Sequence, residues 1–321
     1  MRNYGRIVTS ASYVPPKIMT NDQLAEIIDT SDEWIFSRTG IKQRHIAEGE
    51  NTSDLCIRVA QTLLVNAKLS AEKLDFILVA TMTPDYHTPS VACMVQGAIG
   101  ANQAFAFDLS AACSGFVYAL AMADKLIQTG AKKGLVIGGE VLSRMIDWND
   151  RSTAVLFGDG AGGVLLEASQ QPMILAESLH SDGTKYQALT SGLVAATNGV
   201  ETQSSIQPLQ MEGRAIFDFA TREVTRSLAQ MLASKSEVAV DYFLLHQANS
   251  RILDICARKL HMPREKFLQN MQNYGNTSAA TIPILFDEAV SSGTIILGTK
   301  QHIVMTGFGG GLTWGSLLLE V

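Results

Sequence analysis

Cys113 is the residue of this sequence best suited to nucleophilic chemistry. It lies in the segment FAFDLSAACSGFVYALAMADKLIQTG, residues 105–130, which predicts a short apolar strand, a turn at the cysteine and a helix that ends at Gly130. The predicted helix has little polar face, so we expect it to be buried. Unpaired N–H groups and the positive end of the helix dipole favour a thiolate at such a helix start. The alternative is an ordinary packed cysteine, because free cysteines are among the most buried residues.

The second half of the chain supplies polar residues that could act beside such a thiolate. His246 follows a predicted buried strand over residues 242–245, and open α/β sheets place ligand sites at the carboxyl ends of their strands. Asn276 stands where a helix is predicted to begin, a position that asparagine also favours as a plain cap. The glycine-rich bend over residues 307–311 would let backbone N–H groups approach a ligand closely, or it is simply a turn between strands.

Together these groups form a coherent set for acyl transfer. A thiolate at Cys113 can take an acyl group from a thioester. A neutral His246 and the Asn276 amide can both donate hydrogen bonds to a carbonyl oxygen, and so stabilise an enolate formed beside them. Backbone N–H groups of Cys113 and of the glycine bend can hold the oxyanion. No carboxylate base is needed if the carbanion arises by loss of carbon dioxide.

Composition limits the class of protein. With 321 residues, 46% of them apolar and 17% charged, the chain can bury a large core. Its net charge of −6 and its isoelectric point of about 5.5 argue against nucleic acid as a partner. The cysteines at 56, 93, 113 and 256 form no CxxC pair, which predicts no zinc or other metal site and fits a reducing compartment. Without an apolar leader or an uncharged apolar run of about 18 residues, we expect a cytoplasmic protein that does not enter a membrane.

The second half of the sequence repeats the first. Residues 75–81 resemble residues 241–247 at an offset of 166, residues 7–12 resemble 174–179 at 167, and residues 113–130 resemble 276–293 at 163. We therefore predict two α/β halves, 1–170 and 171–321, each a mostly parallel sheet covered by helices. Packing about a pseudo-twofold axis would place Cys113 and Asn276 at equivalent helix starts.

Two further segments have specific interpretations. Residues 153–167 contain the pattern GxGxxG, but apolar residues typical of a strand follow it, whereas a dinucleotide site needs a helix there. We predict two strands joined by a glycine turn instead. The polar residues 193–210 have no counterpart in the first half, and we predict a surface loop that could act as a lid.

Several motifs resemble one known family closely and nearly end to end. They are AACSG at 111–115, HQAN at 246–249, GNTS at 275–278, GFGGGLTWG at 307–315, DEWI at 32–35 and SRTGI at 37–41. The family is β-ketoacyl-acyl-carrier-protein synthase III. The resemblance implies a thiolase-like fold of five layers, α-β-α-β-α, and a homodimer. It also implies the condensation of an acyl-CoA primer with malonyl-acyl carrier protein that initiates fatty-acid synthesis, with no cofactor besides the CoA thioester substrate.

The resemblance also assigns roles to positions of this chain. Cys113 would be acylated, His246 and Asn276 would assist decarboxylation, and the amides of Cys113 and Gly310 would form the oxyanion hole. The positions that match CoA contacts are Trp34, Arg38, Thr39, Arg151 and Asn249, with Trp34 and Arg151 stacking on the adenine. The positions that match the basic patch for the carrier protein are Arg251, Arg258 and Lys259.

One position departs from the family pattern. Many members have an aromatic residue before the Pro-Ser of the primer-pocket loop, where this chain has Thr88 before Pro89 and Ser90. In the family this loop reaches into the pocket of the partner subunit. The smaller Thr88 predicts room for primers longer or more branched than acetyl-CoA.

Three alternatives stay open at this point. The first is a related condensing enzyme of secondary metabolism, since plant-type polyketide synthases share a Cys-His-Asn set. The second is a Cys-His-Asn thioester hydrolase. The third is a non-catalytic scaffold, for which replacing Cys113 would change no activity.

Overall fold

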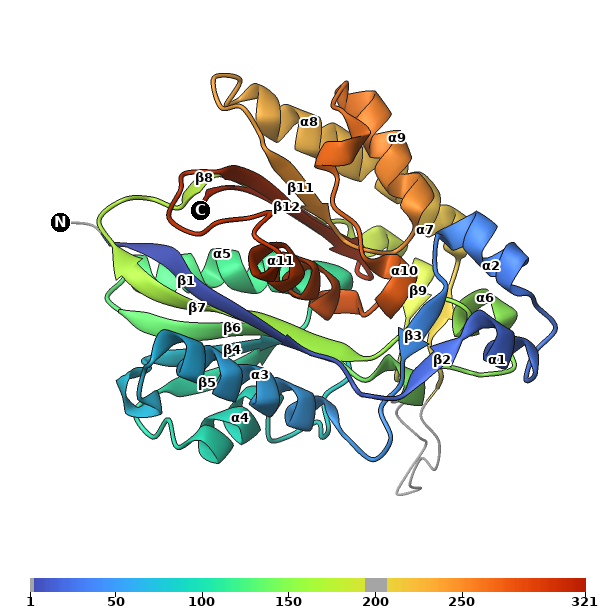
Figure 1. Ribbon diagram of the computed structural model, residues 1–321, viewed down its shortest axis with the longest axis horizontal. Helices are drawn as coiled ribbons and strands as arrows, with labels where there is room; N and C mark the ends of the chain where they lie inside the picture. The colour runs from blue at the N-terminus through green and yellow to red at the C-terminus, as the bar shows by residue number, and fades with distance from the viewer. Residues whose placement is uncertain (1–2, 194–206) are drawn as a thin grey trace.

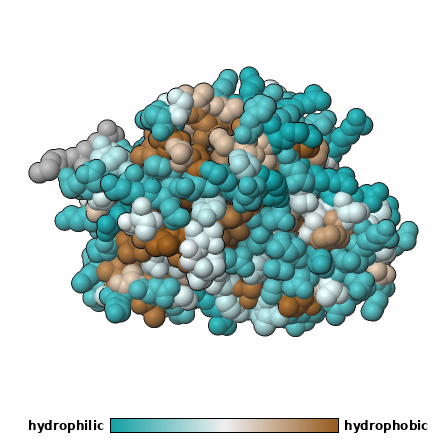
Figure 2. Space-filling model, turned by 45° about the horizontal axis from the view of Figure 1, so that its top comes forward, coloured by the Kyte–Doolittle hydropathy of each residue, from teal (hydrophilic) through white to brown (hydrophobic). Residues whose placement is uncertain are grey.

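The computed structural model describes residues 3–193 and 207–321 (Figure 1). Most of the loop that the sequence predicts over residues 193–210, the suggested lid, therefore lies outside the described residues. Among the described residues, none of the helices combines the length and the apolar character that a bilayer crossing requires. The face drawn in Figure 2 is mostly hydrophilic and carries separate apolar patches, as is usual for a folded domain.

The first sheet contains five strands in the order β1 (Tyr4–Tyr13), β7 (Gly160–Ser169), β6 (Lys133–Glu140), β4 (Phe76–Ala80) and β5 (Phe105–Leu109). β4 is parallel to both β5 and β6, while β7 is antiparallel to β1 and β6. All five residues of β4 are buried, which is why its sequence is an unbroken apolar run instead of an alternating one.

The second sheet repeats this order with one strand fewer. It runs β11 (Tyr242–Leu245), β12 (His302–Gly309), β13 (Thr313–Glu320) and β8 (Ile174–Ser181). β11 and β12 are parallel, and the other pairs are antiparallel. A single parallel bridge between Phe243 and Phe267 occupies the place that β5 has in the first sheet. The predicted duplication of the fold is confirmed, while the division at 170/171 stays a prediction.

Helices complete five layers, and apolar side chains form a core between each pair of layers (Figure 1). α3 (Thr52–Ala67) and α4 (Val91–Ile99) pack on the first sheet from outside. α5 (Gly115–Gln128) and α11 (Thr281–Ser291) lie between the two sheets and contact both. α8 (Thr225–Ala233) and α9 (Ser250–Leu260) cover the second sheet. The α-β-α-β-α architecture is as predicted.

Shorter elements surround this frame. They are β2 (Ile18–Thr20), α1 (Asn21–Ala25), α2 (Asp32–Thr39), β3 (Gln43–His45), α6 (Arg151–Ala154), β9 (Leu189–Thr190), β10 (Gln210–Met211), α7 (Gly213–Phe219) and α10 (Met271–Tyr274). A π-helical turn, residues Ala220–Val224, joins α7 to α8. The 3₁₀ turns η2 (Ala112–Ser114) and η7 (Ser278–Ala280) open the two central helices α5 and α11.

The structural counterpart of Cys113 is Ala279, not Asn276. Each central helix is entered through a non-glycine residue in the left-handed region, Ala112 with φ 44° and Ser278 with φ 49°. These two residues are 166 positions apart, the same offset as residues 75–81 of the β4 region and residues 241–247 of the β11 region. The predicted pairing at an offset of 163 is therefore wrong by three residues. It aligned the polar heads and terminal glycines of the two segments, which do not coincide in space.

The segment 153–167 also differs from its prediction. It forms the end of α6 and then the single strand β7, instead of two strands. Its glycines are explained by packing. A Cβ at Gly162 would lie 2.7 Å from the Ile284 nitrogen of α11, and one at Gly163 would lie 2.7 Å from the Val136 oxygen of β6. Because the pattern leads into a strand, it cannot form a dinucleotide-binding turn.

Replacing Gly162 by alanine tests how closely α11 packs on β7. We expect Gly162→Ala to lower the free energy of unfolding by ~1–3 kcal/mol, because the backbone of α11 must move away. Gly97→Ala in α4 is the matched control, since a Cβ there meets nothing within 4 Å. Its effect should be neutral or stabilising. Urea unfolding measures both, and equal effects of the two substitutions would contradict the packing argument.

Candidate active site

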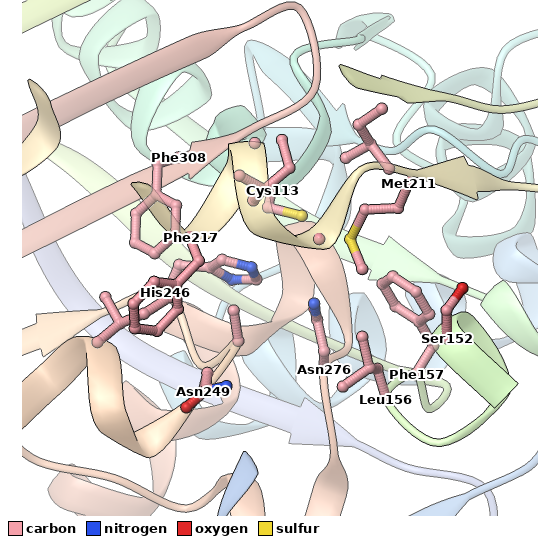
Figure 3. A pocket seen from close by; sticks show the side chains of 16 residues that line it. Cys113, Ser152, Leu156, Phe157, Met211, Phe217, His246, Asn249, Asn276 and Phe308 are labelled. Atoms are coloured by element: carbon pink, nitrogen blue, oxygen red, sulfur yellow. The ribbon is translucent and has the colours of Figure 1, made fainter. Parts of the chain in front are cut away.

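The structure brings Cys113, His246 and Asn276 together around one pocket (Figure 3). Its volume is about 190 Å³. The three residues come from different elements: η2, the end of β11 and the turn before η7. The remaining wall is largely apolar, so a substrate group that enters the pocket leaves most of its water behind.

Burial controls the protonation of Cys113. The residue is only 5% exposed, and its sulfur faces the pocket (Figure 3). Burial raises the pKa of the thiol from an ordinary 9.0 to about 12. That difference corresponds to ~4 kcal/mol, whereas a helix dipole contributes at most ~2 kcal/mol. Desolvation therefore opposes the thiolate that the helix start favours, and it favours the neutral thiol.

His246 is also neutral. It is buried, and desolvation lowers the pKa of its ring from 6.5 to about 3. Its backbone N–H donates to the Thr306 oxygen at 2.8 Å, and its ring packs edge-to-face with Phe308 at a centroid distance of 5.1 Å. These contacts fix the ring in position beside Cys113.

The Thr281 hydroxyl lies between the His246 ring and the Ser278 carbonyl oxygen. It donates its single hydrogen to the Ser278 oxygen at 2.9 Å, and its oxygen lies 2.8 Å from Nδ1 of the ring. Turned to Nδ1 instead, that hydrogen would leave the proton of the neutral ring on Nε2, the form that can donate into the pocket.

Asn276 presents its amide nitrogen to the pocket. The backbone N–H of Ser278 donates to Asn276 Oδ1 at 2.8 Å, which leaves Nδ2 on the pocket side (Figure 3). The backbone of Asn276 is fixed as well. Its N–H donates to the Leu156 oxygen at 2.8 Å, and its oxygen accepts from the Gly158 N–H at 3.1 Å. The GxGxxG segment thus holds a pocket residue in place.

The glycine-rich bend closes against Cys113. A Cβ at Gly309 would lie 3.0 Å from the Cys113 backbone nitrogen, and one at Gly307 would lie 2.7 Å from the Ser114 Cα. Within the described residues, Gly309 lines the pocket and Gly310 does not, although the Gly310 N–H follows directly in the chain. The oxyanion-hole role of the Gly310 amide stays a prediction.

Four of the five residues predicted to contact CoA lie near one another. The guanidinium carbons of Arg38 and Arg151 lie 4.4 and 4.7 Å from the centre of the Trp34 ring. Asn249, which lines the pocket, donates from Nδ2 to the Arg38 oxygen at 2.9 Å. Thr39 differs, because it is buried and its hydroxyl donates to the Ile35 oxygen at 2.7 Å. That hydroxyl fixes the end of α2 and does not reach the pocket.

The three predicted carrier-protein contacts lie exposed on α9. Arg251 and Arg258 are seven residues apart and so share one face of the helix. Arg251 donates to the Ser37 oxygen and Lys259 to the Thr221 oxygen, each at 2.7 Å. These bonds hold the two side chains against the surface of their own subunit.

Thr88 does not line the pocket of its own chain. It lies with Tyr86, His87 and Pro89 in an exposed loop. Its role in primer selection stays a prediction that depends on a second subunit.

Sequence reasoning missed most of the apolar wall of the pocket. These residues are Leu156, Phe157, Leu189, Met211, Ile216, Phe217 and Ile252. They come from segments far apart in the sequence and carry no motif. Among residues 3–193 and 207–321, no group of three or more His, Cys, Asp or Glu residues is placed to hold a metal ion.

Comparison with known proteins identifies the family. Residues 107–183 match the family model of 3-oxoacyl-[acyl-carrier-protein] synthase III, and residues 233–321 match its C-terminal counterpart. The chain is 59% identical to beta-ketoacyl-[acyl-carrier-protein] synthase III of Enterococcus faecalis over the full length of both, and 60% identical to that of Streptococcus suis, again over both full lengths. The crystal structure of the Aquifex aeolicus synthase III superposes with a TM-score of 0.90 at 44% identity, covering 99% of this chain and 100% of that one.

The chain belongs to the β-ketoacyl-acyl-carrier-protein synthase III family. As a synthase III it is an acyl-transferring condensing enzyme that acts at the initiating step of fatty-acid biosynthesis, and its fold is thiolase-like, as the motifs predicted. The hydrolase and scaffold alternatives lose their support at this level of identity.

The neutrality of His246 can be tested directly. Because burial lowers the pKa of its ring to about 3, the ring should stay neutral between about pH 5 and pH 8. Nitrogen-15 NMR should show that the ring signals of His246, identified by their loss in His246→Gln, do not titrate over this range. A ring at position 246 that titrates near pH 6.5 would contradict the assigned environment.

Proposed function

We propose that this synthase III condenses an acyl-CoA primer with malonyl-acyl carrier protein through an acyl-Cys113 intermediate. The products are 3-oxoacyl-acyl carrier protein, CoA and carbon dioxide. The observation that carries the proposal is the convergence of a buried thiol, a neutral imidazole and an amide N–H on one pocket. The CoA thioester is a substrate, so the reaction needs no resident cofactor.

In the first half-reaction, Cys113 Sγ attacks the thioester carbonyl of the primer. The new S–C bond forms, the bond from carbon to the CoA sulfur breaks, and the proton of the Cys113 thiol passes through water to the CoA sulfur, which leaves as a thiol. The N–H groups of Cys113 and Gly310 are the proposed donors to the oxyanion. Such a donor typically contributes ~3–4 kcal/mol to the barrier.

In the second half-reaction, His246 Nε2–H and Asn276 Nδ2–H donate to the malonyl thioester oxygen. Loss of carbon dioxide leaves an enolate, and two neutral donors stabilise its oxygen in a site shielded from water. The enolate carbon then attacks the acyl-Cys113 carbonyl. The C–C bond forms, the S–C bond breaks, and Cys113 leaves as a thiolate that takes a proton from water.

The surface around the pocket supports the proposed substrates. Trp34 and Arg151 form a stacked pair, between which a planar adenine can insert if the guanidinium moves away, with Arg38 and Asn249 beside it. Thr39 can contribute only through its backbone, since its hydroxyl is engaged. Arg251, Arg258 and Lys259 offer the positive charge that an acidic carrier protein needs.

A homodimer is part of the proposal. β5 is an edge strand of the first sheet, and its Phe105 and Phe107 are 49% and 42% exposed. Exposed apolar edge strands favour pairing with another chain. The exposed loop that carries Thr88 can then reach a neighbouring pocket. We place the enzyme in the cytoplasm, which suits its four free cysteines.

Asn276→Asp should separate the two half-reactions. Aspartate keeps the oxygen that accepts from the Ser278 N–H but removes the donor at Nδ2. We expect acylation of Cys113 by acetyl-CoA to persist, while decarboxylation of malonyl-acyl carrier protein falls ~10²–10³-fold. Intact-mass spectrometry measures the adduct, and released carbon dioxide measures the second step.

Cys113→Ala is the complementary variant. It should carry no acyl adduct and form no 3-oxoacyl product, while it retains the donors for decarboxylation. An acyl group found on another residue, or equal loss of both half-reactions in Asn276→Asp, would refute these assignments.

Thr88→Phe tests primer selection. Filling the loop position with an aromatic ring should leave acylation by acetyl-CoA within about threefold and reduce acylation by branched or longer acyl-CoA at least ~10-fold, because the pocket becomes shorter. Intact-mass measurement over a panel of acyl-CoA thioesters provides the comparison. A strict preference of the unaltered protein for acetyl-CoA would end the hypothesis.

A further inference from the structure

Glu288 bridges the two ends of the short helix α10. The residue lies on α11, and each oxygen of its carboxylate accepts one hydrogen bond. Asn270, the residue before α10, donates from Nδ2 to Oε2 at 2.6 Å, and the hydroxyl of Tyr274, the last residue of α10, donates to Oε1 at 2.6 Å. Bonds to an ionised carboxylate are stronger than bonds between neutral groups. Because a helix of 4 residues is not stable by itself, the bridge holds α10 in shape.

The first end of the bridge leads to His246. Gln247 follows the histidine in the chain and is fully buried. Its Oε1 accepts from the Asn270 N–H at 3.1 Å, and its Nε2 donates to the Leu245 oxygen at 2.7 Å. The side chain of Gln247 therefore connects the end of β11 to the start of α10, and it fixes the backbone from which His246 projects.

The second end of the bridge leads to Asn276. Burial and the Glu288 carboxylate raise the pKa of Tyr274 above its ordinary value of 10.0, so the phenol keeps the proton that it donates. The ring of Tyr274 stacks on His45 at a centroid distance of 5.5 Å. Gly275 then turns the chain with φ 66°, a conformation that glycine adopts without strain, and Asn276 follows it. Any displacement of Tyr274 is thus passed to Asn276.

The segment 270–288 contacts both of these pocket residues. It contains Asn276, and the Thr281 hydroxyl oxygen lies 2.8 Å from Nδ1 of the His246 ring. The bond between Asn270 and Glu288 closes this segment into a loop. The side chains of His246 and Asn276 point into one pocket, as two donors to a single oxygen must (Figure 3).

We propose that Glu288 is a positioning residue for the decarboxylation half-reaction. By holding both ends of α10, its carboxylate fixes the relative position of His246 and Asn276, which donate to the same enolate oxygen. Glu288 is not among the described residues that line the pocket, and it acts through Asn270 and Tyr274. The inference rests on the proposed function, in which His246 and Asn276 stabilise the enolate.

Asp287 provides a matched control on the same helix. Its carboxylate also accepts two hydrogen bonds, from the Ser10 hydroxyl at 2.8 Å and from the Ser12 hydroxyl at 2.7 Å. Both serines lie on β1, and no residue of β1 is among the described residues that line the pocket. Asp287→Ala and Glu288→Ala each remove a carboxylate with two donors from α11, but only Glu288→Ala releases α10.

The test measures the two half-reactions separately. Rapid quench and intact mass give the rate constant for acylation of Cys113 by acetyl-CoA. The acetylated protein is then mixed with malonyl-acyl carrier protein, and the release of carbon dioxide gives the maximal rate constant and the half-saturating concentration of the second step. We expect Glu288→Ala to lower that maximal rate constant at least ~10-fold, because the two donors lose their common position.

The other quantities should change little. In Glu288→Ala, acylation and the half-saturating concentration should stay within about twofold, because neither depends on the two donors. In Asp287→Ala, both rate constants should stay within about twofold, although urea unfolding should show that both variants are less stable. Glu288→Gln should recover most of the decarboxylation rate, since its amide can still accept from Asn270 and donate to the Tyr274 oxygen.

Tyr274→Phe carries the same comparison if Glu288→Ala does not fold. It removes one bond of the bridge and keeps the ring on His45, so decarboxylation should fall about threefold or more while acylation is retained. The same ratio of the two rate constants in the unaltered protein, Tyr274→Phe and any folded Glu288→Ala would overturn the positioning role and leave the acyl-Cys113 intermediate intact. Failure of the unaltered protein to form an adduct would instead overturn the proposed function.

Discussion

The close approach of backbone to backbone across the pseudo-twofold axis is the constraint on which this active site depends. Gly138 of the first sheet meets Ala279 of η7, and Gly307 of the second sheet meets Ser114 of η2. In each case a sheet strand of one half contacts the start of the central helix of the other half. A side chain at either glycine would push the two halves apart. The pocket residues come together because nothing larger than hydrogen separates these backbones.

Burial then decides the charge state of the site. Desolvation raises the pKa of Cys113 to about 12 and lowers that of His246 to about 3. Near neutral pH the pocket therefore contains a thiol, a neutral imidazole and an amide. Such a site stabilises negative charge with dipoles that are already oriented, and no Lys or Arg is among the described residues that line it.

The sequence predicted the layers and the three pocket residues, because motifs, apolar runs and strand ends are local signals. Its predictions failed where they depend on how residues of the two halves meet across the pseudo-twofold axis. Cys113 was paired with Asn276 because the two sequence segments were aligned by their first and last residues. The residues in the left-handed region, Ala112 and Ser278, show which positions of the two halves are equivalent in the structure. The thiolate was expected from the helix dipole, which sequence reveals, and not from desolvation, which requires the completed core. Thr39 matched a motif, yet its hydroxyl caps its own helix.

The corrected correspondence also explains how a duplicated frame carries one active site. At the offset of 166, the counterpart of Cys113 is Ala279 and the counterpart of His246 is Ala80. Both alanines are fully buried against Gly115, at the beginning of α5. Because little room is left between the two halves at the axis, the position equivalent to each reactive side chain is occupied in the other half by an alanine. The first half is thereby left with the nucleophile and the second with the histidine and the asparagine, and each half needs the other to complete the pocket.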